Sequence, residues 1–393
     1  MKKKVLFSAS VFHGMNDAAT VTVPMIFPLL YSHQFIINKY SHIGILSNLG
    51  LLTTFFIQIL LASFAHRFEY KHLLLFSLCG LSFSLALLTF SHNFLTLLAT
   101  YLMMRVFASF YHPIGVATVS KTYAGKMLDF AIGIQNGSGN LGVFLAFMTV
   151  GFLAQNFGWK TPLYVWASMI LCIGFVGFLS VRNVSTKSEG LPKPDFSYWK
   201  NSLKGMKYFI LGIFFGGACW GTTVYYAPSL FNHKFLVPLG STGVFLASWI
   251  GIGTIVTYVF GYLSRKFGRT KLTQWSLVGS TIFCFLLGIA PSQILALISL
   301  FFFGAFIFII YPAFQSFVGE EISAKNQIHA FSIVANVQML SGAIVVFIAG
   351  FLSDKFGIHS PFLLLSFIGA LISIYYLVKP SKLVLNSNLN TSK

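Results

Sequence analysis

Long apolar runs, each separated from the next by a short polar or basic segment, constrain this chain more than any other feature. A transmembrane helix needs about 20 predominantly apolar residues to cross the hydrocarbon core. Runs of this kind predict twelve spans, at residues 5–30, 41–65, 73–91, 94–118, 130–154, 160–181, 206–228, 241–264, 272–290, 293–317, 330–352 and 360–378. The first run follows three lysines, as a signal peptide does, but its apolar stretch is too long for one. We therefore expect an all-α polytopic membrane protein.

The composition argues against several other classes of protein. Only 9% of the residues are charged and 56% are hydrophobic, whereas soluble domains carry roughly 25% charged residues. This leaves too little polar surface for a soluble enzyme and too much apolar sequence for a disordered chain. The four cysteines lie inside apolar runs, which does not suit a disulfide scaffold. The net charge of +18 is spread over short loops, so it does not indicate nucleic-acid binding.

The distribution of basic residues predicts the orientation of the spans. With the N-terminus inside, the outer loops hold only Lys39, Lys160, Lys234 and Lys355, and Arg105 lies within a span. The remaining Lys and Arg residues fall on the inner side, as the positive-inside rule requires. We therefore expect both termini to be cytoplasmic and the protein to reside in the cytoplasmic (inner) membrane.

The longest polar connection, near the middle of the chain, predicts two halves. It runs from about Arg182 to Lys207 and contains Lys, Glu, Pro and Asp, as linkers do. The expected organisation is an N-terminal six-helix bundle at 1–182, a cytoplasmic linker at 183–205, a C-terminal six-helix bundle at 206–379 and a cytoplasmic tail at 380–393.

The two halves also share an internal repeat. When Gly151 is placed on Gly350, the segment Gly-Phe-Leu-Ala-Gln-Asn-Phe-Gly at 151–158 falls on Gly-Phe-Leu-Ser-Asp-Lys-Phe-Gly at 350–357. The same shift places Pro113 on Pro312 and residues 62–68 on residues 261–267. A parallel repeat of six spans is similar to the build of major facilitator superfamily transporters.

The loops after the second and eighth predicted spans strengthen the resemblance to that superfamily. Its loop motif reads Gly-x-Leu-x-Asp-Arg-x-Gly-Arg-Arg. The second copy in this chain keeps much of that pattern, and the first copy is degraded; the motif residues are Arg67, Lys71, Gly261, Arg265, Lys266, Gly268 and Arg269. Neither copy has the usual Asp. The resemblance implies two bundles that expose a central site alternately to each side of the membrane, with these loops taking part in the movement.

A narrower resemblance covers the N-terminal half. His13-Gly-Met-Asn16-Asp17, Tyr111-His112-Pro113 and Gly137-Ser-Gly139-Asn140-Leu-Gly142 resemble motifs of fosmidomycin-resistance-type efflux proteins. This resemblance implies drug efflux driven by proton exchange. The chain departs from those proteins at Arg105, where a small residue is expected.

Asp17 and Arg105 are ionisable groups deep within predicted spans. Each costs about 2.5–3.5 kcal/mol near mid-bilayer, which favours a functional role. We expect Asp17 to be the proton site and Arg105 its modulator or an anchor for an anionic substrate; the alternative is a static ion pair. His13 shares a helix face with Asp17, and His112 shares one with Arg105. These histidines could join the proton-coupling site, bind a cation, or be satisfied structural residues.

Polar and aromatic residues in the spans are candidates for substrate binding. The Gly-x-x-x-Gly pair formed by Gly133 and Gly137, by contrast, predicts close packing against a neighbouring helix. A polar wall facing an aromatic wall suits an amphipathic organic molecule, although most aromatic residues must serve packing. The candidates are Asn16, Ser109, Tyr111, Gln135, Asn136 and Asn140 in the N-terminal half and Trp220, Tyr225, Tyr226, Tyr311, Gln315 and Asn336 in the C-terminal half.

The predicted function is secondary active transport. The sequence has no phosphate-binding loop, His-Glu-x-x-His or nucleophile elbow, so we expect no enzymatic activity, no cofactor and no bound metal. The favoured reading is proton-coupled efflux of a small organic molecule by alternating access. The alternatives are proton-coupled uptake of a metabolite or metal-chelating compound and, more remotely, a membrane-embedded enzyme or receptor. The expected partners are the substrate, protons and the lipid bilayer, with no nucleic acid, and we expect a monomer.

Overall fold

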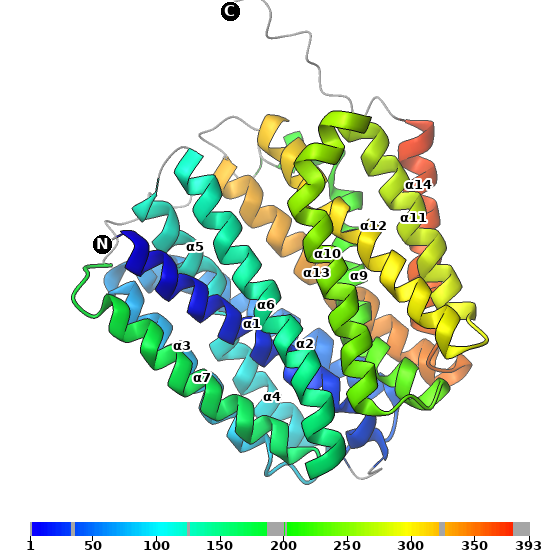
Figure 1. The fold of residues 1–393 in the computed structure, drawn as a ribbon, viewed down its shortest axis with the longest axis horizontal. Coiled ribbons are helices and arrows are strands. Elements are labelled where there is room, and N and C mark those ends of the chain that lie inside the picture. Colours follow the sequence, from blue (N-terminus) through cyan, green and yellow to red (C-terminus); the bar gives the residue numbers. More distant parts are fainter. Residues whose placement is uncertain are drawn as a thin grey trace, which may run out of the picture. The chain divides into compact units, whose positions relative to one another are not determined.

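A computed structural model describes residues 2–32, 36–123, 126–186, 200, 203–321 and 327–379. No β-strand occurs within these ranges, so the all-α prediction is confirmed. The elements, labelled in Figure 1, are α1 (Lys2–Ser32), α2 (Tyr40–Phe64), the 3-10 turn η1 (Ala65–Arg67), α3 (Tyr70–Leu88), α4 (Phe94–Ala108), α5 (Tyr111–Thr122), α6 (Lys126–Phe157), α7 (Lys160–Val181), α9 (Ile210–Ser229), the π-helical turn η2 (Leu230–Lys234), α10 (Leu239–Phe267), α11 (Arg269–Ile289), α12 (Gln293–Glu321), α13 (Gln327–Phe356) and α14 (Ser360–Val378).

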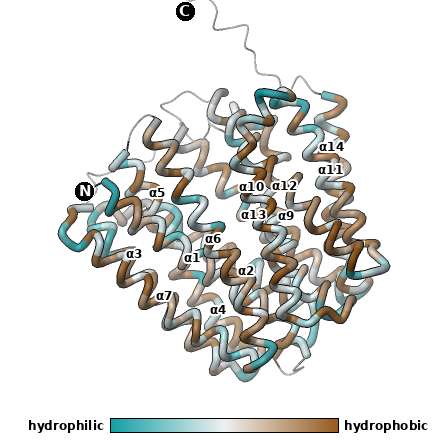
Figure 2. Tube along the Cα trace, in the orientation of Figure 1, coloured by the Kyte–Doolittle hydropathy of each residue, from teal (hydrophilic) through white to brown (hydrophobic). Residues whose placement is uncertain are grey.

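The helices have the length and the surface of membrane spans. In the described part of the chain, eleven helical stretches are long and apolar enough to cross a bilayer, and α1 corresponds to the first predicted span. Large apolar side chains such as Phe56, Leu95 and Ile294 are exposed on these helices. Figure 2 shows hydrophobic residues along the helices and hydrophilic residues gathered near their ends. Lipid tails are as apolar as these side chains, so the prediction of a polytopic membrane protein is confirmed.

The contacts divide the chain into two compact units. Unit 1 comprises Met1–Pro192 and Val224–Ile250, and unit 2 comprises Lys193–Thr223 and Gly251–Lys393. The bundle boundaries at 1–182 and 206–379 stay predictions. Of the predicted linker at 183–205, residues 187–199, 201 and 202 lie outside the described residues, as does the whole predicted tail at 380–393.

In unit 1, α1 packs against α5, α6 and α7. Gly14 on α1 and Gly142 on α6 allow the closest approach, because a Cβ atom on Gly142 would overlap the carbonyl group of Gly14. The packing predicted for Gly133 is wrong, since a Cβ there would meet no atom within 4 Å. The tight crossing at Gly14 places the polar residues of the next turn of α1 beside the backbone of α6.

The predicted span at 94–118 is interrupted in the structure. Helix α4 ends at Ala108 and α5 begins at Tyr111. The cause is Pro113, which lacks an N–H group for the Ser109 carbonyl and whose ring clashes with that carbonyl. The new helix α5 packs on α1, and its first two residues, Tyr111 and His112, face the polar residues of α1.

The repeat partner of Pro113 behaves differently. In unit 2, helix α12 continues through Pro312. Pro312 cannot donate to the Phe308 carbonyl. The hydroxyl of Thr257 on α10 lies 3.2 Å from that oxygen and 2.9 Å from the Gly253 carbonyl of its own helix, so its single hydrogen is shared between the two acceptors. A neighbouring side chain thus offsets part of the missing helical bond, as membrane helices with an internal proline often require.

The helix ends reproduce the repeat more closely. Gly158 follows α6 with φ 84° and Gly357 follows α13 with φ 94°. Both glycines lie at the same position of the aligned segments and adopt a left-handed conformation that residues with a Cβ avoid. The structure therefore places two aligned sequence positions in the same turn of each copy.

Candidate functional site

The candidate site lies in unit 1, around Asp17 of α1. His13, one turn earlier, places Nε2 3.0 Å from Asp17 Oδ2. His112 of α5 places Nε2 3.6 Å from the other carboxylate oxygen, to which Asn16 also donates at 3.1 Å. The Asp17 side chain is 22% exposed and that of His112 is 44% exposed, whereas His13 is buried. The structure therefore brings together three of the four residues predicted for proton coupling.

The contacts of His13 define its protonation pattern. Its Nδ1 atom lies 2.8 Å from the backbone carbonyl oxygen of Gln135 on α6. A carbonyl can only accept a hydrogen bond, so Nδ1 carries a hydrogen. In neutral histidine Nε2 would then present a lone pair to the Asp17 carboxylate. A proton on either Nε2 or Asp17 turns this repulsive contact into a hydrogen bond, so the observed geometry suits a pair that holds one exchangeable proton.

Gly139 of α6 borders this pair. A Cβ atom at Gly139 would lie 2.7 Å from His13 Nε2 and 2.8 Å from Asp17 Oδ2, which is closer than ordinary van der Waals contact. The absence of a side chain at Gly139 therefore makes room for the contact between His13 and Asp17. Sequence reasoning identified Gly139 only as part of a motif, because its distance to α1 depends on the crossing at Gly14.

Arg105, the fourth predicted proton-coupling residue, has a different partner. Its Nε donates to the Gly50 carbonyl of α2 at 3.3 Å, and its side chain is buried. Asp17 makes its charged contacts with the two histidines. The predicted pair of Asp17 and Arg105 is not formed in the described part of the chain, because α4, which carries Arg105, packs on α2 and ends before Pro113.

The same three side chains have a spacing that a metal ion could bridge. One ligand atom from each of His13, Asp17 and His112 lies within 4.8 Å of the others. Three donors leave a tetrahedral ion with one open position. A shared proton fits the shorter contact directly, so the distances by themselves do not require a metal.

The other substrate-binding candidates of unit 1 are mostly buried. Asn16, Ser109, Tyr111, Gln135 and Tyr226 are buried, and the hydroxyls of Tyr225 and Tyr101 bond each other at 2.7 Å. Asn140 is half-buried and Asn136 is exposed. Buried residues of this kind hold helices together. Of the asparagines at 136 and 140, Asn140 is the better candidate for substrate binding, because it is half-buried and adjoins Gly139 in sequence.

In unit 2, the predicted aromatic residues form a packed cluster. The Trp220 ring lies 6.2 Å from that of Phe308, which lies 5.7 Å from that of Tyr311. The Tyr311 hydroxyl donates to the Gly216 carbonyl of α9 at 2.8 Å. Asn336 is half-buried and Gln315 is exposed. The cluster joins α9 to α12.

The first copy of the loop motif clamps the chain that follows α7. The Nζ atom of Lys71 donates to the carbonyls of Arg182 and Val184, each at 2.8 Å. Glu69 accepts hydrogen bonds from the Thr186 amide at 2.6 Å and the Thr186 hydroxyl at 2.8 Å. Burial raises the pKa of Glu69, but these bonds and one from Ser185 outweigh it and hold the pKa below its ordinary value. Sequence reasoning identified Lys71 but missed Glu69.

The remaining motif residues are mostly exposed. Arg67, Gly261, Arg265, Lys266 and Gly268 are exposed. Arg269 is half-buried and lies with its guanidinium 5.4 Å from the centre of the Phe317 ring of α12. Gly268 separates α10 from α11 with φ 80°, a turn that favours glycine.

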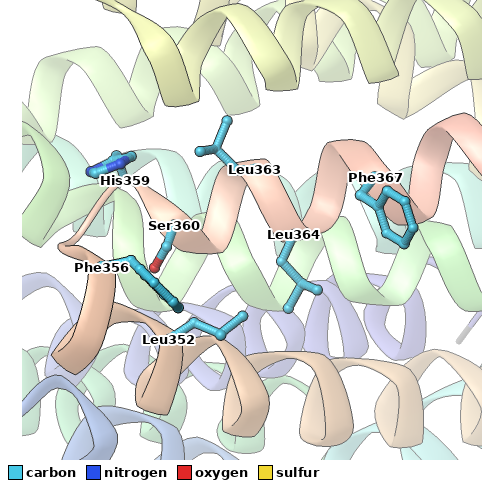
Figure 3. A pocket seen from close by; sticks show the side chains of 7 residues that line it. All are labelled: Leu352, Phe356, His359, Ser360, Leu363, Leu364 and Phe367. Atoms are coloured by element: carbon cyan, nitrogen blue, oxygen red, sulfur yellow. The ribbon is translucent and has the colours of Figure 1, made fainter.

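A hollow of about 470 Å³ lies in unit 2 (Figure 3). It contains none of the predicted site residues and is mainly apolar. Leu352 and Phe356 of α13 line one side, across from Leu364 of α14. Its lining offers no cluster of ionisable groups, so it does not compete with the Asp17 site as a centre of chemistry.

Comparison with known proteins decides the family. A family model described as the Major Facilitator Superfamily matches residues 6–346, and a second match covers residues 258–391. The chain belongs to the major facilitator superfamily. No protein of curated function matches this superfamily member in sequence.

Solved structures share the fold of this major facilitator chain. A bacterial homologue of the human lysosomal transporter Spinster, inward-facing and occupied, has a TM-score of 0.78 at 14% identity, over 98% of this chain and 96% of that one. The nucleoside transporter NupG has a TM-score of 0.76 at 12% identity, over 95% and 98%. The peptide transporter POT in complex with sulfate has a TM-score of 0.79 at 12% identity, over 97% and 95%. The family and these likenesses indicate a transporter fold rather than an enzyme; the resemblance to fosmidomycin-resistance-type proteins stays a prediction.

Proposed function

We propose that this chain is a proton-coupled secondary transporter that exports a small organic molecule across the cytoplasmic membrane as a monomer. The contact between His13 and Asp17 carries the proposal. With Nδ1 of His13 committed to the Gln135 carbonyl, the 3.0 Å contact between Nε2 and Asp17 is favourable only when the pair holds a proton. Loss of that proton makes the contact repulsive and favours a rearrangement of α1 against α6.

The position of the pair supports coupling to transport. Asp17 lies near the middle of α1, where an ionisable group is costly and is therefore usually functional. The Asp17 side chain is 22% exposed and that of His112 is 44% exposed, so the carboxylate is not sealed within the protein, as access of protons and a substrate requires. In alternating access, a group that is protonated on one side and deprotonated on the other links the proton gradient to the conformational cycle.

The direction of transport follows from a flux experiment. Purified protein is reconstituted in proteoliposomes with an acidic lumen, and a radiolabelled probe is added outside. Fosmidomycin is the first probe, and compounds that stabilise the protein in a ligand thermal-shift screen are tested next. Exchange for protons predicts accumulation of the probe in the acidic lumen. Accumulation in an alkaline lumen together with protons would instead indicate uptake, including uptake of a metabolite or metal-chelating compound.

Asp17→Asn tests the proton site in the same vesicles. We expect it to abolish gradient-driven accumulation while exchange of labelled for unlabelled probe continues, because exchange needs no net proton movement. Unchanged gradient-driven accumulation in Asp17→Asn removes Asp17 from the mechanism and with it this proposal.

A further inference from the structure

We infer that Tyr111, acting with the side chain of Gln135, is a positioning residue that fixes which nitrogen of His13 faces Asp17. The inference rests on the proposed proton role of Asp17. Sequence reasoning assigned both Tyr111 and Gln135 to substrate binding, but both are buried, at 1% and 0% exposure.

The hydroxyl of Tyr111 is fully engaged within the protein. It donates to the Ala9 carbonyl of α1 at 2.9 Å and accepts from Nε2 of Gln135 at 2.6 Å. Its ring also stacks on the His13 ring, with centroids 4.5 Å apart and planes inclined by 25°. A hydroxyl with one donated and one accepted bond, on a residue that is only 1% exposed, is not available to a substrate.

These contacts close a ring of interactions around His13. Ala9 precedes His13 by one helical turn, so the Ala9 carbonyl is also the helical acceptor for the His13 amide. The backbone carbonyl of Gln135 binds Nδ1 of His13, and the side-chain amide of Gln135 donates to the Tyr111 hydroxyl. Tyr111 thus ties together the backbone of α1 and the residue of α6 that sets the His13 tautomer.

Tyr111 also affects the second histidine. His112 is its chain neighbour, and the edge of the His112 ring meets the His13 ring with centroids 5.4 Å apart. Anchoring Tyr111 to α1 and α6 therefore also keeps His112 within 3.6 Å of Asp17. The break at Pro113 makes this possible, because it starts a new helix at Tyr111.

The surroundings of His13 contain few other titratable groups. Asp17 faces it from α1, and Tyr111 and His112 face it from α5. The described part of α6 beside it offers the uncharged Gln135 and Gly139. On the other helices packed against α1, Cys79 of α3 and Tyr164 and Cys172 of α7 are exposed, and Arg105 of α4 is bonded to Gly50.

Nitrogen-15 NMR of histidine-labelled full-length protein tests the inference without a substrate. The His13 signal is assigned by its loss in His13→Asn. We expect the wild type to keep a hydrogen on Nδ1 throughout. In Tyr111→Phe, which keeps the ring stack, and in Gln135→Leu, we expect the other neutral tautomer to appear.

Matched variants separate the possible outcomes. Tyr123→Phe is the control. Tyr123 is buried just after the end of α5, in an apolar cluster with Ala9, Val119 and Ala131, and loss of its hydroxyl leaves the bonds of Tyr111 to Ala9 and Gln135 in place, so the His13 signal should be unchanged. A His13 tautomer that is unchanged in both Tyr111→Phe and Gln135→Leu overturns the inference. Failure of the proposed function is seen separately, as gradient-driven transport that persists in Asp17→Asn.

Discussion

Nε2 of His112 lies 3.6 Å from Oδ1 of Asp17, beyond the range of a strong hydrogen bond, and 44% of the His112 side chain is exposed. His13 approaches the other oxygen to 3.0 Å and is buried. The two histidines therefore interact with the Asp17 carboxylate unequally, and the buried His13 makes the stronger contact.

This inequality predicts different effects of the two substitutions. His13→Asn removes a buried hydrogen bond to a charged group, so we expect gradient-driven transport to fall roughly tenfold to a hundredfold. His112→Asn removes a longer, more exposed contact, so we expect a loss of only a few fold. Initial rates of proton-driven flux in proteoliposomes measure both, and equal losses would show that the two histidines act as one unit.

The absence of a side chain at Gly139 leads to a second prediction, about the effect of Gly139→Ala on transport. Gly139→Ala places a methyl group against both His13 and Asp17, so we expect proton-driven transport to be largely lost although the protein still inserts into the membrane. Gly133→Ala is the matched control on the same helix, since a Cβ there meets no atom within 4 Å. It should transport normally and gain about 0.5–1 kcal/mol in helix stability. Full activity of Gly139→Ala would contradict the packing described around Asp17.

The bond between Thr257 and Phe308 predicts a rescue. Thr257→Val removes the hydroxyl donor from the Phe308 carbonyl, and we expect the free energy of unfolding to fall by about 1 kcal/mol. Pro312→Ala supplies a backbone N–H for the same carbonyl, so Thr257→Val should cost less in the Pro312→Ala background than in the wild type. Denaturant unfolding of the wild type, both single variants and the double variant gives the values, and an equal cost of Thr257→Val in both backgrounds would refute the role of Thr257.

Glu69 predicts a pH-dependent contribution to stability. Its pKa is lower in the folded protein than in the unfolded chain, so its stabilising effect is present above the unfolded pKa, about 4.3. The effect is lost as the pH falls through the lower folded value. We expect Glu69→Gln to lower the melting temperature near pH 7 and to match the wild type in strong acid. Lys71→Met, which removes a cation that helps to lower the Glu69 pKa, should lower the melting temperature near pH 7 and show a smaller acid dependence than Glu69→Gln.

Local sequence was enough to predict the class of fold. Runs of about 20 apolar residues cannot form a soluble domain, and a backbone in lipid must satisfy its hydrogen bonds within each span, which leaves helices. The proximity of His13 to Asp17 was also predictable, because residues four apart on one helix lie on the same face. The repeat was also visible, because glycines such as Gly158 and Gly357 are required by local turns whatever surrounds them.

Contacts between helices were decided only by the tertiary structure. Asp17 and Arg105 both lie deep in their spans, but their helices turn them toward different neighbours, a rotation that sequence spacing does not encode. Pro113 and Pro312 occupy equivalent positions, yet only the second helix continues, and there Thr257 approaches the orphaned carbonyl from another helix. Which nitrogen of His13 faces Asp17 depends on the Gln135 carbonyl, a backbone atom 122 residues away along the chain. Depth and helical period are properties of one segment, whereas a hydrogen-bond partner is fixed by how segments pack.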